Sequence, residues 1–262
     1  MSLMLQEDRD FFIALLKSFP KVLPKLFSEE KKDESDETFR KYVNDWIMDR
    51  WRSLVKTPTQ RHLCDFIETI PQFQEYFPVP DYNDFFIGEL ASLIKTGSKE
   101  VKKLASISYC ELYLKNYLSA TRSGTLGKIL SLSKSTTCFE RLAALGFVEV
   151  AMTYFSRRFL AEEGIVKAYL SLGEDKIANV RIKFVVLSPK MNKLIVQEEL
   201  RSQLMMVLTL HQNDMDKDVR KLAKDAYQSI KQQGIVNEDD SMKEKREQDL
   251  IKKEKEVLCM NC

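Results

Sequence analysis

The sequence predicts an all-α fold, an α-solenoid built from stacked antiparallel helix pairs. Its 262 residues include only 8 Gly and 7 Pro, and so few turn formers suit long helices with short connections better than a sheet with many tight turns. The hydrophobic fraction of 44% and the charged fraction of 31% fit helices that are buried along one stripe and wet along the other. An apolar pattern also recurs at near-constant intervals, which is typical of a repeat architecture.

The repeat is clearest in four segments that begin at Val101, Phe139, Val180 and Val219, at successive intervals of 38, 41 and 39 residues. In each segment the apolar residues fall three or four positions apart, which places them on one face of a helix. One step further back, the same spacing begins at Leu63. A single helix pair cannot bury such a face alone, so we expect neighbouring pairs to stack and share one continuous core.

Residues 1–80 are the least regular part of the chain, and we expect irregular helical repeats there. Residues 5–17 and 38–55 show helical periodicity. The segment from 28 to 37 is charged and contains no apolar residue, and we interpret it as a solvated loop. It holds serines that a kinase could phosphorylate, but an inert loop is the favoured interpretation.

Residues 81–234 are expected to form regular helix pairs. The first helices are predicted at about 82–95, 122–133, 158–171 and 196–211, and the second helices at about 99–117, 137–153, 176–188 and 217–232. Gly97 and Gly173 follow first helices, and we expect them to end these helices in the left-handed conformation. Ser98 and Asp216 are expected to accept hydrogen bonds from the free N–H groups of the helices that follow them.

Two further helix starts match the capping box, in which a hydroxyl residue is followed three positions later by Glu or Gln. Thr137 with Glu140 fits at one start, and Thr57 with Gln60 fits at the other. Pro58 would then occupy the first helical position, where its missing N–H group costs nothing.

The repeat stops before residues 235–262, half of which are charged. Their apolar spacing does not sustain a heptad, so we interpret the segment as a solvated helix or frayed tail, with the opening of a coiled coil as the alternative. Cys259 and Cys262 are too isolated for a structural zinc site and lack the pattern of a prenylation signal, so no role is assigned to them.

The five cysteines are odd in number and follow no secretory signal, which favours free thiols in a reducing compartment and hence the cytoplasm. No apolar run approaches the length that crosses a bilayer, so we expect no membrane association. The formal net charge is only +2, so binding to nucleic acid would require a local basic patch.

The sequence also argues against an enzyme. Its two histidines, His62 and His211, are far apart, and neither a nucleophile elbow nor a glycine-rich phosphate loop is present. Acidic residues are abundant but occur in charged, solvated runs, so none is singled out as a catalytic acid or base. We expect no catalytic residues, no cofactor and no metal site.

The two C-terminal repeats carry Asn-Val-Arg at 179–181 and Asp-Val-Arg at 218–220, near the start of their second helices. These segments resemble the second helix of HEAT repeats, which are armadillo-like helical repeats. Together with the charged segment that follows, residues 156–258 are similar to the HEAT-repeat regulatory subunits of serine/threonine protein phosphatases, those of protein phosphatase 4 in particular. The resemblance implies a scaffold that binds a phosphatase catalytic subunit and performs no chemistry itself.

The resemblance also implies that the turns inside the helix pairs form the ridge that holds the catalytic partner. These turns lie near Lys99, Lys134, Lys176 and Lys217. The positions implied most strongly are Asp175, Lys176 and Asn179, followed by Lys217 and Asp218. A plain solvated turn is the alternative interpretation.

Each repeated second helix carries a cation near its start, at Lys102, Arg141, Arg181 and Arg220. Stacking would align these cations as a basic stripe, which could dock an acidic protein surface or, as an alternative function, bind nucleic acid. The favoured interpretation is a ladder in which the cations bond aspartates of their own or the adjacent repeat, and Asp175, Asp214 and Asp218 are placed for this. The full set of candidate partner-binding residues is Lys99, Lys102, Arg141, Asp175, Lys176, Asn179, Arg181, Lys217, Asp218 and Arg220.

Overall fold

The computed structural model of the chain describes residues 6–26, 34–56, 59–77, 79–115, 119–233 and 240–260. All regular secondary structure in these ranges is helical, and the helices pack as pairs, which confirms the predicted all-α solenoid. The chain divides into two compact units, residues 1–116 and 117–262. The division predicted at residues 80 and 234 rests on the regularity of the sequence pattern, and it stays a prediction.

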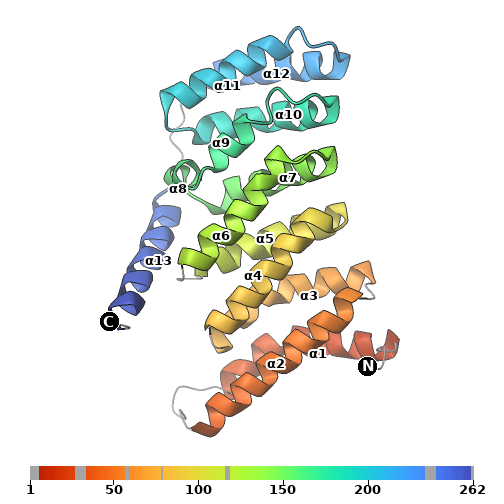
Figure 1. Cartoon of the computed structure of the whole chain (residues 1–262), viewed down its shortest axis with the longest axis vertical. Coiled ribbons are helices and arrows are strands. Elements are labelled where there is room, and N and C mark those ends of the chain that lie inside the picture. The colour runs from red at the N-terminus through yellow and green to blue at the C-terminus, as the bar shows by residue number, and fades with distance from the viewer. Residues whose placement is uncertain are drawn as a thin grey trace. The chain divides into compact units, whose positions relative to one another are not determined.

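Unit 1 contains α1 (Gln6–Leu26), α2 (Glu34–Lys56), α3 (Gln60–Phe73), the short 3-10 helix η1 (Gln74–Tyr76), α4 (Val79–Thr96) and α5 (Lys99–Lys115). The α3 helix packs between α1 and α5, and α4 pairs with α5 (Figure 1). Both N-terminal helices are longer than predicted, and the segment from 34 to 37, expected in a loop, is the start of α2. Thr57 and Pro58, which belong to one expected capping box, lie outside the described residues.

Aromatic side chains build the core of unit 1. Trp51 and Phe66 are fully buried, and their ring centroids lie 5.0 Å apart in an edge-to-face arrangement. Phe86 approaches the same indole at 5.5 Å. The indole N–H of Trp51 donates to a carboxylate oxygen of Glu89 at 2.9 Å, so this large apolar side chain is buried without leaving its polar atom unpaired.

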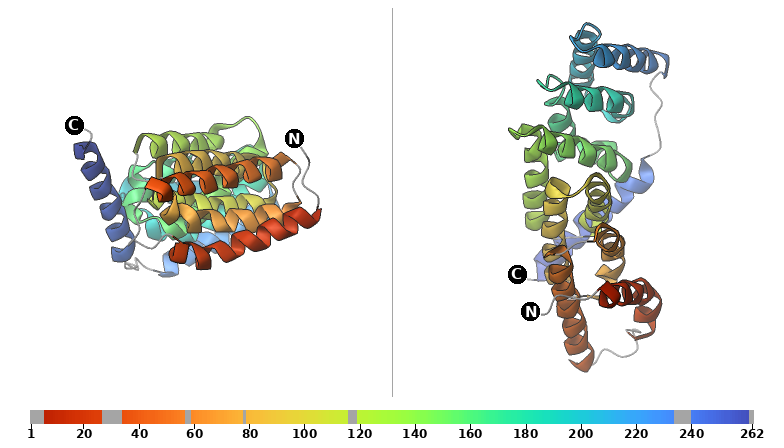
Figure 2. Two further views of the ribbon diagram at one scale, coloured as in Figure 1. Left: turned by 90° about the horizontal axis from the view of Figure 1, so that it is seen from below. Right: turned by 90° about the vertical axis from the view of Figure 1, so that its right-hand side faces the viewer.

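Unit 2 contains α6 (Ser119–Ser131), η2 (Leu132–Lys134), α7 (Cys138–Tyr154), α8 (Arg157–Glu162), α9 (Ile165–Leu170), α10 (Ala178–Leu194), α11 (Glu198–His211), α12 (Lys217–Gln233) and α13 (Ser241–Met260). The second helices of successive pairs pack against one another, α7 on α10 and α10 on α12. Figures 1 and 2 show these pairs stacked, with α13 outside the stack.

The repeat register is correct at Val101, Val180 and Val219 and wrong at Phe139. Each of the three valines is the third residue of its helix and is at most 2% exposed. Phe139 is the second residue of α7 and is 74% exposed. Phe139 lies one helical position before the position of the three valines, so the sequence repeats were aligned one residue out of register at α7. The positions that do correspond are the fourth residues of the helices, which include Arg141, Arg181 and Arg220.

The helix caps follow the predictions in part. The hydroxyl of Ser98 accepts a hydrogen bond from the Val101 N–H at 3.4 Å, and a carboxylate oxygen of Asp216 accepts from the Val219 N–H at 3.1 Å. The capping box at Thr137 is wrong, because the Thr137 side chain makes no cap hydrogen bond. Instead, the Thr137 N–H donates to the hydroxyl of Ser135 at 3.1 Å, which closes a local turn.

The left-handed conformation expected at Gly97 and Gly173 is wrong. Among the described residues, positive φ occurs at Gly164 alone, with a value of 76°. A Cβ atom at Gly97 would lie 2.6 Å from Cγ1 of Val101, and one at Gly173 would lie 2.9 Å from Cγ1 of Val207. Glycine is thus required at these two positions for close packing and not for backbone conformation.

Gly164 breaks the helix that was predicted from 158 to 171. The left-handed glycine ends the short α8 and lets α9 start in a new direction. The start of α8 is capped by Ser156, whose hydroxyl accepts a hydrogen bond from the Phe159 N–H at 3.1 Å.

The C-terminal segment is not a wholly solvated helix or frayed tail. α13 packs against α8, and its Glu247 and Leu250 are only 6% and 3% exposed. The Glu247 carboxylate accepts hydrogen bonds from the Ser156 N–H, at 2.7 Å, and from the Ser156 hydroxyl. The Arg157 N–H donates to Asp240 at 2.9 Å. Two acidic side chains therefore accept hydrogen bonds from backbone N–H groups at the start of α8.

Candidate protein-binding surface

An arginine and an aspartate tie the pair α6–α7 to the pair that follows. Nε and Nη2 of Arg141 donate to the two carboxylate oxygens of Asp175, with the Nη2 contact at 2.9 Å. Nη1 of the same guanidinium donates to the backbone carbonyls of Ser135 and Thr136, at 2.8 and 3.1 Å. Asp175 also accepts from the Ile177 N–H at 2.9 Å, so its carboxylate is fixed by the turn in which it lies.

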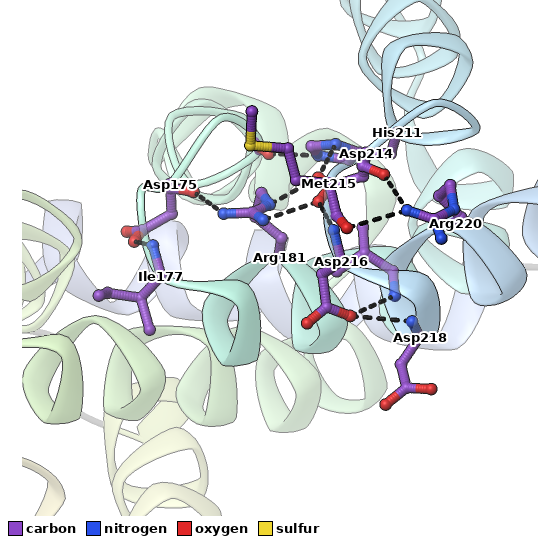
Figure 3. Close-up of polar contacts among 11 residues, drawn as sticks. Asp175, Ile177, Arg181, His211, Asp214, Met215, Asp216, Asp218 and Arg220 are labelled. Carbon is purple, nitrogen blue, oxygen red and sulfur yellow. Dashed lines mark hydrogen bonds and ion pairs between the residues drawn. The ribbon is translucent and has the colours of Figure 1, made fainter.

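We call this arginine–aspartate contact between consecutive helix pairs a joint. A second joint has the same geometry one pair further along the chain (Figure 3). Nε and Nη2 of Arg181 donate to Asp214 at 2.7 and 2.8 Å, and Nη1 donates to the backbone carbonyl of Asp175 at 2.7 Å. Asp214 accepts from the Asp216 N–H at 2.9 Å. Each aspartate thus accepts hydrogen bonds both from the arginine of the preceding pair and from a backbone N–H group of its own turn.

The ladder ends at Arg220. Its Nη1 donates to the backbone carbonyls of Asp214 and Met215 at 2.6 and 2.9 Å, as Nη1 of the earlier arginines does in their own turns. Within the ranges that the structure describes, no carboxylate pairs with the remaining edge of this guanidinium. Arg220 is therefore held in the ladder geometry without a partner from a further pair.

His211 contacts the aspartate of the second joint and the backbone of the turn before α10. Its Nδ1 lies 3.2 Å from a carboxylate oxygen of Asp214, and its Nε2 lies 2.6 Å from the carbonyl oxygen of Gly173. The ring is buried and crosses Phe184 edge-on at 6.3 Å. From the sequence we considered His211 only as a candidate catalytic residue, and we did not predict this structural role. Its place three residues before Asp214 was the available signal.

The electrostatics of both joints stabilise the charged forms of the aspartates. Burial raises the pKa of Asp175, but the hydrogen bonds from Arg141 and from the Ile177 N–H outweigh it, and the net shift is downward. The hydrogen bond from Arg181 lowers the pKa of Asp214 more than burial raises it. Bidentate pairs with so little exposure are strong, and they cost much free energy if one partner is removed.

The ladder interpretation is thus confirmed for Arg141 and Arg181, each of which pairs with an aspartate of the next helix pair. It is wrong for Asp218, which was also expected to pair with a cation. The Asp218 side chain is exposed, and the contact of this residue in the turn is a hydrogen bond from its N–H to Asp216 at 2.8 Å. Of Asp214 and Asp218, it is Asp214 that pairs with Arg181.

Next to the ladder lies a row of exposed side chains that we call the turn ridge. It consists of Lys176, Asn179, Lys217 and Asp218, which flank the turns before α10 and α12. Among the described residues, none of these side chains takes part in a hydrogen bond or ion pair. The Arg181–Asp214 joint connects the two turns, so it fixes the spacing of the ridge. Met215, which the sequence analysis did not single out, is 99% exposed in the second turn.

Two of the candidate residues lie in unit 1. Lys99 is the first residue of α5 and is exposed, while Lys102 is half-buried at the fourth position of the same helix. Lys102 therefore has the local position of the ladder arginines. In the described part of the chain its ammonium makes no ion pair, and the ladder interpretation is not borne out there.

The described residues contain no group of three or more His, Cys, Asp or Glu side chains that could hold a metal ion. Likewise, no helix in the described ranges combines the length and the apolar character that crossing a membrane requires.

Comparisons with known proteins identify no family for this chain. No family model matches the sequence, and no curated protein matches it. Among solved structures, the chain is similar to a designed armadillo repeat protein at 14% sequence identity, over 81% of this chain and 99% of the other, with a TM-score of 0.39. At that score the likeness adds nothing to the observed packing of helix pairs.

Proposed function

We propose that this chain is a non-catalytic scaffold, and that its turn ridge binds the catalytic subunit of a serine/threonine protein phosphatase. The observation that carries the proposal is the contrast between the ladder and the ridge. The ladder side chains are hydrogen-bonded within the chain. The side chains of the turn ridge are exposed, and they flank turns that the ladder connects. Polar side chains presented by turns of fixed backbone are suited to protein recognition, because the turns themselves need little ordering on binding.

The choice of a phosphatase as partner rests on the resemblance of residues 156–258 to HEAT-repeat phosphatase subunits. The Asn-Val-Arg and Asp-Val-Arg motifs behind that resemblance lie at the starts of α10 and α12. Arg181 of the first motif forms a ladder pair, and the first residues of the two motifs, Asn179 and Asp218, belong to the ridge. The motifs thus explain how the ridge is positioned, while the identity of the partner has to be tested.

Nucleic-acid binding by the basic stripe is the weaker alternative. Two of the stripe's cations, Arg141 and Arg181, are paired with carboxylates that are at most 7% exposed, and all three nitrogens of each guanidinium already donate within the chain. The stripe therefore lacks the row of free cations that a phosphate backbone requires.

The test is a binding titration between the purified full chain and a purified catalytic subunit of protein phosphatase 4. We expect binding that weakens at least tenfold when Lys176 and Lys217 are both changed to Glu, because reversed charges inside an interface repel. Lys167→Glu, an exposed lysine on α9 away from both turns, is the matched control and should bind normally. Binding that ignores the double reversal would exclude the ridge, and no binding by the native chain would exclude this phosphatase.

A further inference from the structure

We propose that one side of α12 is a second docking surface, which binds an acidic helical segment of another protein through Arg220. This surface is distinct from the turn ridge, and the inference does not depend on the phosphatase as partner. It follows from comparing α12 with α10, which has the same position in the preceding pair but is covered on both sides.

The two covered sides of α10 are identified by their contacts. Lys183 pairs with Glu149 on α7, and Lys190 donates to the Thr153 hydroxyl on α7 at 3.0 Å. The side that carries Arg181 instead faces the turn before α12, where Asp214 lies. Side chains on this second side of α10 are buried, as Val185 shows with 0% exposure.

The same side of α12 is open and basic. The offset of 39 residues that relates Arg181 to Arg220 relates the buried Val185 to Lys224, which is exposed. Tyr227 and Lys231 follow on the same side of α12, three and seven positions after Lys224. Tyr227 is half-buried, and the Lys231 ammonium lies 4.6 Å from the centre of its ring. We call Arg220, Lys224, Tyr227 and Lys231 the end face. A terminal repeat needs a polar outer side, but a polar side alone does not require an arginine locked in ladder geometry.

Among the described residues, no further helix pair covers the end face. After α12 the next described helix is α13, and it packs against α8, where Glu247 bonds Ser156. In the structure as described, the helices packed on α12 are α10 and α11. The end face is therefore available to a partner.

The chemistry of the partner follows from the two completed joints. In each joint the arginine donates through Nε and Nη2 to an aspartate two residues before the N-cap of the next pair's second helix. Arg220 has the same Nη1 contacts and the same two donors available. Residues 217–233 contain five basic and two acidic side chains, so they complement an acidic segment.

A second copy of this chain is a poor occupant. At the start of the ladder in unit 2, Ser135 takes the position that Asp175 and Asp214 hold further along, and its hydroxyl accepts from the Thr137 N–H. A hydroxyl cannot provide the two acceptor oxygens that the guanidinium fork matches. The aspartates that this chain has at that position elsewhere, Asp175 and Asp214, are already paired within it, so the end face fits a different protein with an aspartate at the same place before a helix.

The experiment places a photoreactive benzoylphenylalanine at Lys224 of the full chain and identifies the crosslinked segment by mass spectrometry, in extracts of cells that express the chain. We expect an acidic segment with an aspartate just before a helix, and at least a tenfold loss of the adduct when Arg220→Gln is added. The same probe at the exposed Val186 on α10 is the matched control and should not capture this segment. Adducts with nucleic acid, adducts with another copy of the chain, or no adduct would each overturn the proposal.

The captured segment then allows a decisive second measurement. It is synthesised as a peptide and as a twin in which the aspartate is asparagine, and both are titrated against the chain and its Arg220→Gln variant. We expect the twin to bind the native chain at least tenfold more weakly, and the two peptides to bind the variant equally. A twin that loses the same affinity with both proteins would show that Arg220 is not the receptor of the carboxylate. Phosphatase binding at the turn ridge can fail or succeed independently of this result.

Discussion

Arg181 and Asp214 are joined by two parallel hydrogen bonds, of 2.7 and 2.8 Å, that connect consecutive helix pairs of unit 2. The pair is largely shielded from water, with the side chains 14% and 7% exposed. The same aspartate accepts from the backbone of its turn and contacts His211. One carboxylate thus fixes the packing between pairs and the shape of the turn that presents the ridge.

Replacing Asp214 by Asn should destabilise unit 2 substantially. The variant leaves the Arg181 guanidinium shielded from water without its counter-charge, which should cost about 2 kcal/mol or more of unfolding free energy. Asp218→Asn, in the same turn but exposed, is the control and should change stability by less than about 0.5 kcal/mol. Urea denaturation measures both. Equal stabilities of the two variants would show that the joint is energetically unimportant.

The ladder should also weaken in acid. The pKa values of Asp175 and Asp214 are lowered in the folded chain, so the folded state holds the charged carboxylates more favourably than the unfolded state does. This stabilisation is present above the unfolded pKa, about 4, and is lost as pH falls through the lower folded values. The stability difference between the native chain and Asp214→Asn should therefore shrink below about pH 4. A difference that stays constant down to pH 2 would contradict this.

The docking of α13 should have the opposite pH dependence. Burial raises the pKa of Glu247 more than the hydrogen bonds from Ser156 lower it. The contribution of Glu247 to docking is then complete below the unfolded pKa and is lost as pH rises through the raised folded value. Hydrogen-exchange protection factors of α13 should decrease with rising pH in the native chain and less so in Glu247→Gln. If protection increases with pH, Glu247 binds α8 best as a carboxylate.

Glycine at 173 should be required for packing. Gly173→Ala places a methyl group 2.9 Å from Cγ1 of Val207 and 3.1 Å from the Phe184 ring, and should cost about 1–3 kcal/mol through overpacking. Gly146→Ala in α7 is the control, because its methyl group would have no atom within 4 Å apart from its chain neighbours and the backbone of its own helix. That change should stabilise the chain by about 0.5–1 kcal/mol. Thermal unfolding of the two variants shows whether their effects have opposite sign.

The helix pairs and the position of the cations could be predicted because both depend on local periodicity. Val180 and Val219 lie where the apolar pattern places them, and Arg181 and Arg220 follow at the fourth helical position. The predicted repeat register is wrong at Phe139, because the apolar pattern does not show whether an apolar residue at the start of a helix is buried or exposed.

The remaining features depend on contacts between segments that periodicity does not encode. The choice of Asp214 over Asp218 depends on the turn geometry that points one carboxylate back at Arg181. Glu247 lies in a run of charged residues and resembles a solvated side chain, but the partner that buries it, Ser156, is 91 residues away in the sequence. Gly173 owes its role to the approach of Val207 from another helix.

The central claim is that Arg141 and Arg181 form an internal ladder that joins helix pairs and are not part of a free docking stripe. A double-mutant cycle tests it most directly, with Arg181→Leu, Asp214→Leu and the double variant compared by their unfolding free energies. The account predicts a coupling of about 1–3 kcal/mol, with the double variant more stable than the two single losses would give by addition. Losses that add to within about 0.5 kcal/mol would mean that the two side chains act independently, and the ladder would not hold the pairs together.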